Sequence, residues 1–207
     1  MSDSRCLNAG DTVVIASHNP GKLLDLRSCF PELSTLSAAE LGVPDAPEEG
    51  RDFRSNAAQK ALDASRATGL PGIADDCGLC ISGLGDEPGI FSKRHALRSG
   101  GWKEGMADLW ERLQRSGSGP AATFHCALAL AFPDGFHHCV EGIVHGEVIW
   151  PPRGSKGAGY DPFFLPAGGE RTFGEMSDEE RLRKNHRSVA CGLLYHSGLL
   201  RFRNSMF

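Results

Sequence analysis

Apolar and polar positions alternate in two different patterns along the first third of the chain. The run at Thr12–Ala16 predicts a buried strand, which the turn residues 17–21 follow directly. Apolar residues then recur at helical spacing from about Lys22, and Pro31 ends that pattern. A second helix is predicted over 52–68, with Gly69 as its stop. A strand followed by a helix is typical of α/β proteins.

The remaining two thirds predict more extended structure. The expected elements are extended segments over 72–84, a turn-rich stretch to Gly101, a helix from Trp102 to Arg115, strands near 121–132 and 136–150, and a helix over 181–194 behind a Ser177–Glu180 capping box. Helices and strands therefore alternate early, and strands pair later. No internal repeat or low-complexity tract is present.

Length and composition limit the class of protein. The 207 residues suit one domain or two closely packed lobes, and we treat 1–207 as a single domain with a flexible segment over about 1–10. With 40% hydrophobic and 23% charged residues, the chain matches an ordinary globular protein. A formal charge of −4 argues against a broad basic surface for polymeric nucleic acid.

The N-terminal ten residues lack the apolar core of a secretory signal. The longest apolar run, Ala127–Phe132, is too short to cross a bilayer. We therefore expect no membrane association and a cytoplasmic location. The seven cysteines form no regular framework, which favours reduced thiols. A zinc site at Cys77-x-x-Cys80 would require further ligands whose spacing matches no paired knuckle, so it is the weaker interpretation.

Two polar constellations stand next to predicted strands. Gly21 and Lys22 open a helix after a strand, which suits phosphate, although an ordinary turn has the same composition. It is no Walker loop, because Leu23 and Ala16 replace the required residue types. Asp75 and Asp76 interrupt an apolar run, and buried adjacent carboxylates indicate a divalent cation or a base, with a solvated turn as the alternative.

Two further constellations suit a nucleotide. The bend at 157–164 places Tyr160 and Asp161 side by side, where an aspartate can accept from a purine edge and an aromatic ring can cover the base. A turn before a strand has the same residue types. The basic run at 181–187 suits phosphate, and its alternative is a solvated helix face.

In this order, the motifs resemble the inosine-triphosphate pyrophosphatase family, also called the dITP/XTP pyrophosphatases, over nearly the whole chain. The matching segments are Val14–Lys22, Phe53 with Asn56-Ala57 and Lys60-Ala61, Asp75–Leu79, Pro88–Ser92, Phe124–Cys126, Gly159–Pro162, Glu175–Ser177 and His186-Arg187. The resemblance implies an elongated α/β fold with a mixed, twisted sheet flanked by helices, a nucleotide cleft between two lobes, a homodimer, and Mg²⁺ as cofactor.

The resemblance also assigns roles. It implies that Asp76 is the general base and a metal ligand, together with Asp75 and Glu48 at the metal. The residues that it implies for substrate binding are Ser17, His18, Asn19, Pro20, Gly21, Lys22, Cys77, Ala158, Gly159, Tyr160, Asp161, Arg181, His186 and Arg187. The substrate would be a purine nucleoside triphosphate, cleaved to monophosphate and pyrophosphate.

The chain departs from the family pattern inside the site. Pro47 replaces a glutamate, with Glu48 or Glu49 as its substitute, and Ser55 replaces an acid. Ala158 replaces an aromatic that stacks on the base, and Arg181 replaces a lysine. Three functions therefore remain open: hydrolysis of ITP, dITP or XTP; a Maf-type pyrophosphatase for pyrimidine or modified nucleotides; and a catalytically weakened nucleotide-binding dimer.

Overall fold

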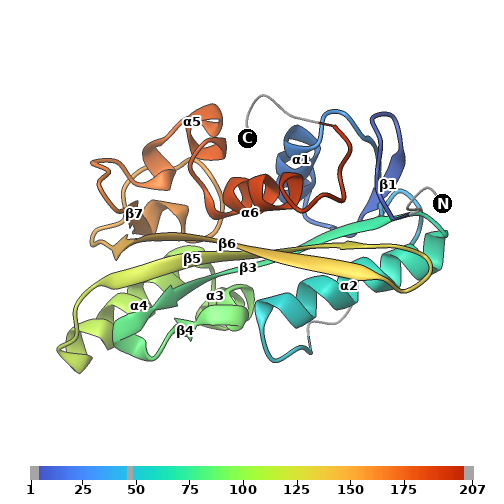
Figure 1. Cartoon of the computed structure of the whole chain (residues 1–207). Helices are drawn as coiled ribbons and strands as arrows, with labels where there is room; N and C mark the ends of the chain where they lie inside the picture. Colours follow the sequence, from blue (N-terminus) through green and yellow to red (C-terminus); the bar gives the residue numbers. More distant parts are fainter. Residues whose placement is uncertain (1–4, 46–48, 203–207) are drawn as a thin grey trace. The chain divides into compact units, whose positions relative to one another are not determined.

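The computed structural model, which describes residues 5–45 and 49–202, confirms an α/β fold with a mixed sheet flanked by helices (Figure 1). The chain divides into two units. Unit 1 contains Met1–Asp76, Cys126–Gly142 and Arg187–Phe207, and unit 2 contains Cys77–His125 and Ile143–His186. The long strands β3 (Gly72–Ile81), β5 (Ala121–Ala131) and β6 (His137–Val148) each contribute residues to both units.

The sheet of unit 1 follows from the first apolar run. β1 (Thr12–Ile15) pairs in parallel with β2 (Ser34–Ser37) and with the start of β3, so that Val14 lies opposite both Leu36 and Gly72. Val13, Val14 and Ile15 are fully buried. Parallel strands are covered on both faces, which explains why this strand reads as a continuous apolar run. β5 and β6 complete this part of the sheet.

Three helices flank the strands of unit 1. Figure 1 shows α1 (Pro20–Cys29) and α6 (His186–Tyr195) on one side of the strands and α2 (Phe53–Thr68) on the other. α2 begins at an Asp52 capping box and ends at Gly69, whose φ of 69° is left-handed. Both ends agree with the sequence prediction, because each depends on local residues.

Unit 2 is built on the C-terminal parts of β3 and β6 and on the N-terminal part of β5. Its other elements are η1 (Ser82–Leu84), β4 (Glu87–Pro88), η2 (Gly89–Phe91), α3 (Ser92–Ser99), α4 (Trp102–Ser116), η3 (Asp161–Phe163), β7 (Phe164–Pro166), η4 (Phe173–Glu175) and α5 (Asp178–Leu182). β4 pairs antiparallel with β3, and β7 pairs antiparallel with β6. The core of this unit contains Leu109, Leu113, Phe163, Phe164 and Phe173 among other buried residues.

The structure differs from the sequence prediction at two helices. The stretch before Gly101, expected to be turns, contains α3, a short helix whose apolar residues are Ala96 and Leu97, too few to define a helical pattern. The helix expected over 181–194 is broken: α5 ends at Leu182 and α6 begins at His186. The predicted capping box at Ser177 and Glu180 is present, but it starts only the first of these two helices.

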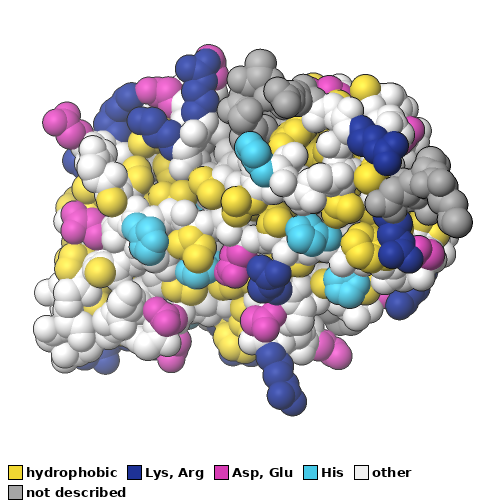
Figure 2. All heavy atoms as spheres, in the orientation of Figure 1, with side chains coloured by type: hydrophobic (Ala, Val, Ile, Leu, Met, Phe, Trp, Pro, Cys, Tyr) yellow, Lys and Arg dark blue, Asp and Glu magenta, His cyan; other side chains and the backbone are white. Residues whose placement is uncertain are grey.

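None of the helices in the described part of the chain is long and apolar enough to cross a membrane. On the face that Figure 2 presents, basic and acidic side chains are interspersed. Leu7, in the segment expected to be flexible, is buried and forms a bridge with Leu200.

Candidate active site

The turn between β1 and α1, residues 17–22, is held by its own side chains. Asn19 caps α1, since its side-chain oxygen accepts from the N–H groups of Gly21 at 2.9 Å and Lys22 at 3.3 Å. The Asn19 N–H donates to the Ser17 hydroxyl at 3.2 Å, and Pro20 occupies the first helical position. Because the cap takes two N–H groups, the attraction of this turn for an anion rests on the Lys22 ammonium and the helix dipole.

His18 belongs to the same turn and contacts residues that follow β2. One ring nitrogen lies 3.0 Å from the Val43 carbonyl oxygen, and the other lies 3.4 Å from the Asp45 carboxylate. His18 also lines a small hollow together with Lys60 and Asp63 of α2. The ring therefore joins the turn to the segment that leads from β2 towards α2.

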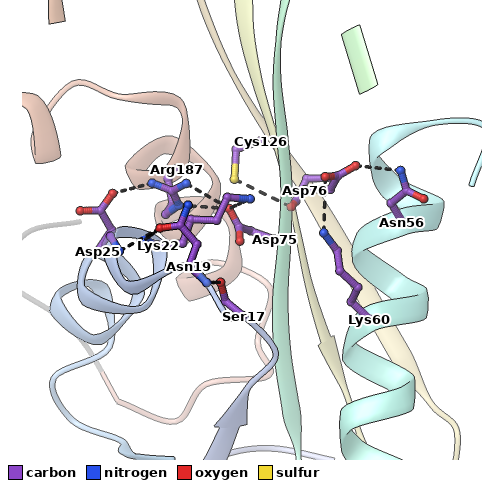
Figure 3. Close-up of polar contacts among 12 residues, drawn as sticks. Ser17, Asn19, Lys22, Asp25, Asn56, Lys60, Asp75, Asp76, Cys126 and Arg187 are labelled. Atoms are coloured by element: carbon purple, nitrogen blue, oxygen red, sulfur yellow. Dashed lines mark hydrogen bonds and ion pairs between the residues drawn. The ribbon is translucent and has the colours of Figure 1, made fainter. Parts of the chain in front are cut away.

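Asp76 of β3 faces α2 and is 4% exposed. Its carboxylate accepts a hydrogen bond from Asn56 Nδ2 at 2.9 Å and lies 3.4 Å from Lys60 Nζ (Figure 3). Asn56 is itself fixed, because its side-chain oxygen accepts from the Gly50 N–H at 2.7 Å. One amide and one ammonium thus hold this buried carboxylate in a single position.

Asp75, the preceding residue, points to the other side of β3. Its Oδ2 accepts from Arg187 Nε at 3.2 Å and Nη2 at 3.1 Å, and lies 3.2 Å from Lys22 Nζ. Arg187 also donates to Asp25 of α1 at 2.5 Å. Figure 3 shows these residues on the side of β3 opposite Asn56 and Lys60.

Alternation along the strand explains why the two aspartates do not share one environment. Successive side chains of a strand point to opposite faces, so Asp75 and Asp76 meet different cations. Three acids, with Asp25 as the third, are matched by three cations, namely Lys22, Lys60 and Arg187.

The chemistry of the donors fits a hard divalent cation. Carboxylate oxygens are the ligands that Mg²⁺ prefers, and the Asp76 side chain is 6% exposed. Because charges in this cluster already balance, an added cation is best matched by additional anionic charge, such as a triphosphate. Glu48, predicted at the metal, and Pro47 lie outside the described residues. Ser55, where the family pattern has an acid, completes the capping box of Asp52.

In unit 2, the loop at residues 157–161 is closed by Asp161. The carboxylate of this buried residue accepts from the Ala158 N–H at 2.8 Å. Gly157 has a φ of 74°, and a Cβ there would lie 2.1 Å from Asp161 Oδ2, so glycine alone fits. Arg181 Nε lies 4.0 Å from the same carboxylate. The Asp161 carboxylate, which can accept a hydrogen bond, and the Arg181 guanidinium are thus held close together.

Tyr160 supports this loop from the core. The side chain is 2% exposed, and its hydroxyl lies 2.9 Å from His95 Nδ1 and 3.4 Å from the Ser92 carbonyl oxygen. His95 Nε2 lies 2.9 Å from Asp108 Oδ2. Burial raises the pKa of Tyr160 well above its usual value, and the nearby Asp108 charge raises it further. The hydroxyl therefore stays protonated and anchors the loop.

His186 and Arg187, both predicted to bind the substrate, have different surroundings. The His186 ring stacks on Phe124, with centroids 4.7 Å apart and planes at 16°. Arg187 instead binds Asp25 and Asp75 as described above. Successive helix residues point about 100° apart, which gives neighbours separate partners.

The sequence-predicted residues thus form two described groups. In unit 1 they are Ser17, His18, Asn19, Pro20, Gly21, Lys22, Asp75, Asp76 and Arg187; in unit 2 they are Cys77, Ala158, Gly159, Tyr160, Asp161, Arg181 and His186. Sequence reasoning omitted Asn56, Lys60 and Asp25 from the site. Their signal was a polar residue on the buried face of a helix, since Asn56 and Lys60 are 2% and 6% exposed.

All seven cysteines are free thiols. Among the described residues, no cluster of three or more metal-donor atoms includes Cys80. Cys77 directly follows Asp76 and is half-buried.

Comparison of the sequence with known proteins gives consistent matches over most of the chain. The Ham1 family model matches residues 13–196. The chain is 46% identical over 191 residues to a dITP/XTP pyrophosphatase of Gluconobacter oxydans, with 90% of each chain covered. It is 42% identical over 182 residues to a dITP/XTP pyrophosphatase of Zymomonas mobilis, covering 86% of this chain and 87% of that protein.

Solved structures agree. A HAM1 protein from Coxiella burnetii has a TM-score of 0.81 at 35% identity, covering 89% of this chain and 96% of the other. The Staphylococcus aureus Ham1 protein has a TM-score of 0.78 at 32% identity, again covering 89% and 96%. Both the family model and the solved structures therefore match Ham1 proteins across most of the chain.

Proposed function

Since the chain belongs to the Ham1 family, we propose that it hydrolyses deaminated purine nucleoside triphosphates to the monophosphate and pyrophosphate. The substrates would be ITP, dITP and XTP, and the reaction would remove them from the nucleotide pool. The relatives named dITP/XTP pyrophosphatase, at 42% to 46% identity, support this substrate class.

The observation that carries the proposal is the buried carboxylate of Asp76. A general base has to be held at one position, and Asn56 and Lys60 fix this carboxylate from α2. Burial of a carboxylate with only 4% exposure costs free energy of folding, so such a group is typical of a functional site. Asp76 is therefore our candidate for the group that activates water.

The reaction balances with one proton transfer. Asp76 takes a proton from water, the water oxygen forms a bond to the α-phosphorus, and the bond from this phosphorus to the bridging oxygen breaks. Pyrophosphate leaves with the electron pair of that bond. Lys22 places positive charge at the start of α1, where it offsets charge on phosphate oxygens.

We propose Mg²⁺ as the cation, with Asp76 and Glu48 as its protein ligands. Asp75, also predicted at the metal, lies on the opposite face of β3 and binds Arg187 and Lys22 instead. When bound, the cation would supply Lewis-acid stabilisation of phosphate charge. The oxygen donors and the need for balancing anionic charge support this choice.

The base would lie at the loop of residues 157–161, where Asp161 accepts from the N–H edge of the purine while Arg181 and His186 contribute polar contacts. We also propose that the protein is cytoplasmic and that it forms a homodimer. Analytical sedimentation measures the mass of the assembly and so tests the dimer.

The proposal is tested with pyrophosphate release from ITP, dITP, XTP, ATP, GTP and pyrimidine triphosphates in the presence of Mg²⁺. We expect turnover of the three deaminated purines and a loss of about 10²–10⁴-fold in Asp76→Asn, as is typical when a general base is removed. Asp63→Asn is the matched control, since Asp63 lies on α2 and pairs with Gln59 and Arg66.

Other outcomes separate the alternatives. Preferred turnover of pyrimidine or modified nucleotides would point to the Maf-type activity. Tight nucleotide binding with no turnover, even at high Mg²⁺, would identify a catalytically weakened binding protein. An Asp76→Asn variant that is folded and as active as the wild type would refute Asp76 as the base.

A further inference from the structure

Trp102 has no part in the site described so far, yet it stands next to it in unit 2. It is the first residue of α4 and follows two glycines of positive φ, Gly100 and Gly101. The side chain is 41% exposed. One half of a large aromatic ring system is therefore in contact with protein, and the other half is open to solvent.

The buried part of Trp102 contacts the loop of residues 157–161. Its ring meets Tyr160 edge to face, with centroids 5.1 Å apart and planes at 90°. A Cβ built on Gly159 would lie 3.3 Å from Cζ3 of the indole, so the six-membered ring rests against the Gly159 backbone. Trp102 thus contacts two successive residues of this loop.

Tyr160 is held in place without Trp102. Its hydroxyl contacts His95 and Ser92, and His95 is in turn fixed by Asp108 at 2.9 Å. The Tyr160 ring is a rigid support behind the indole rather than a group that needs the indole for support. Removing the indole should therefore leave the loop in position.

The loop itself presents no ring to solvent. Ala158 is exposed and ends in a methyl group, while the Tyr160 ring is 2% exposed. The resemblance to the family leads one to expect an aromatic at residue 158. Among the described residues, Trp102 is the half-exposed aromatic that contacts this loop.

We infer that Trp102 supplies the aromatic surface on which the substrate base stacks, in place of a ring at residue 158. The inference rests on the proposed function and assigns its base selectivity to a residue of α4. The stacking energy between an indole and a base grows with the area of the base, so Trp102 favours purines over pyrimidines. Discrimination among purines is left to the polar groups of Asp161, Arg181 and His186.

The test compares KM and kcat for ITP with those for ribose 5-triphosphate, which lacks a base. Removal of an aromatic that stacks on a base costs about 1–3 kcal/mol, and 1.4 kcal/mol is about tenfold. We expect Trp102→Ala to raise the KM for ITP about tenfold with little change in kcat or in the KM for ribose triphosphate. Trp102→Phe should recover most of the affinity.

Trp150→Ala is the matched control. Trp150 is 44% exposed and belongs to the same unit, but it stacks on Trp110, with centroids 6.2 Å apart. This variant should keep the wild-type KM for both substrates. An unchanged KM for ITP in Trp102→Ala, or an equal rise for both substrates, would overturn the inference. A Trp102→Ala variant that sediments as a monomer while the wild type sediments as a dimer would also overturn the inference, because Trp102 would then contact a partner subunit.

A binding measurement separates this inference from the proposed function. If wild-type protein releases no pyrophosphate, the proposed function fails, and quenching of tryptophan fluorescence by IMP still reports stacking. Quenching in the wild type that is lost in Trp102→Phe supports Trp102 as the base platform. Equal quenching in both proteins contradicts it.

Discussion

Asp75 and Asp76 are neighbours in sequence with separate cations, and this separation organises the site at the level of single residues. Asp76 depends on Asn56 and Lys60, both from α2. Asp75 has Arg187 and Lys22 from two different helices. Removal of one cation should therefore affect the two acids unequally.

Lys60→Met is the variant that isolates Asp76. It leaves a buried carboxylate with the Asn56 amide, and breaking a buried ion pair typically costs about 3–5 kcal/mol. We expect the free energy of unfolding in urea to fall by that order, together with a loss of pyrophosphate release.

Lys22→Met is the matched comparison. Asp75 keeps both guanidinium contacts from Arg187, and the Lys22 side chain is 26% exposed. The loss of stability should therefore be clearly smaller than in Lys60→Met. Equal losses in both variants would show that Lys60 does not stabilise Asp76 specifically.

At the level of elements, local signals predicted more than long-range ones. The ends of α2 were predictable, since Asp52 and Gly69 act within a few residues of the helix. The break before α6 was not, because it brings Arg187 to Asp25 and Asp75, which lie far away in sequence. The place of Asn56 and Lys60 likewise depends on how α2 packs against β3, and no local pattern encodes that packing.

Gly72 sets this packing distance. A Cβ at Gly72 would lie 2.4 Å from the Ala61 carbonyl oxygen of α2, and backbone has little room to move. Gly72→Ala should push α2 away from β3 and lower the free energy of unfolding by about 1–3 kcal/mol. Activity should fall as well, because Asn56 and Lys60 move with the helix.

Gly119→Ala offers a control near the start of another strand. A Cβ there meets nothing within 4 Å. Its urea midpoint should match or slightly exceed that of the wild type, since alanine reduces the entropy of the unfolded chain. If both glycine variants were equally stable, close packing of α2 on β3 would not be a constraint.

At the scale of the whole molecule, each unit holds a buried acidic group that stays protonated. Burial raises the pKa of the Cys191 thiol in unit 1 well above its usual value, and the neighbouring Cys29 thiol raises it further. Burial likewise raises the pKa of Tyr160 in unit 2. In the unfolded chain, these groups ionise near pH 8.5 and 10 respectively.

Stability should therefore decrease in alkali. A raised folded-state pKa contributes stability that is fully present below the unfolded pKa and is lost as pH rises above it. We expect Cys191→Ala to flatten the fall in unfolding free energy between pH 9 and 10.5 by up to about 1.4 kcal/mol per pH unit, equivalent to one proton. Urea titrations across this range measure it, and parallel curves for variant and wild type would contradict it.

The positions of the site residues in the chain's helices, strands and loops were predictable in part. Short motifs predicted Lys22 at a helix start, Asp76 in an extended segment and Asp161 in a bend, because those motifs are contiguous. The motif His186-Arg187 predicted one role for two residues that have separate partners, since the direction of each side chain depends on the fold around it.

The ion pair of Arg187 also has a consequence for biosynthesis. Arg187 follows Asp75 by 112 residues and Asp25 by 162. During translation, the ribosome releases α1, α2 and β3 well before it adds the arginine that joins two of their carboxylates. Completion of this cluster is therefore a late event in the folding of a newly made chain, and a nascent chain that stops before α6 lacks one of its three cations however well its first strands have formed.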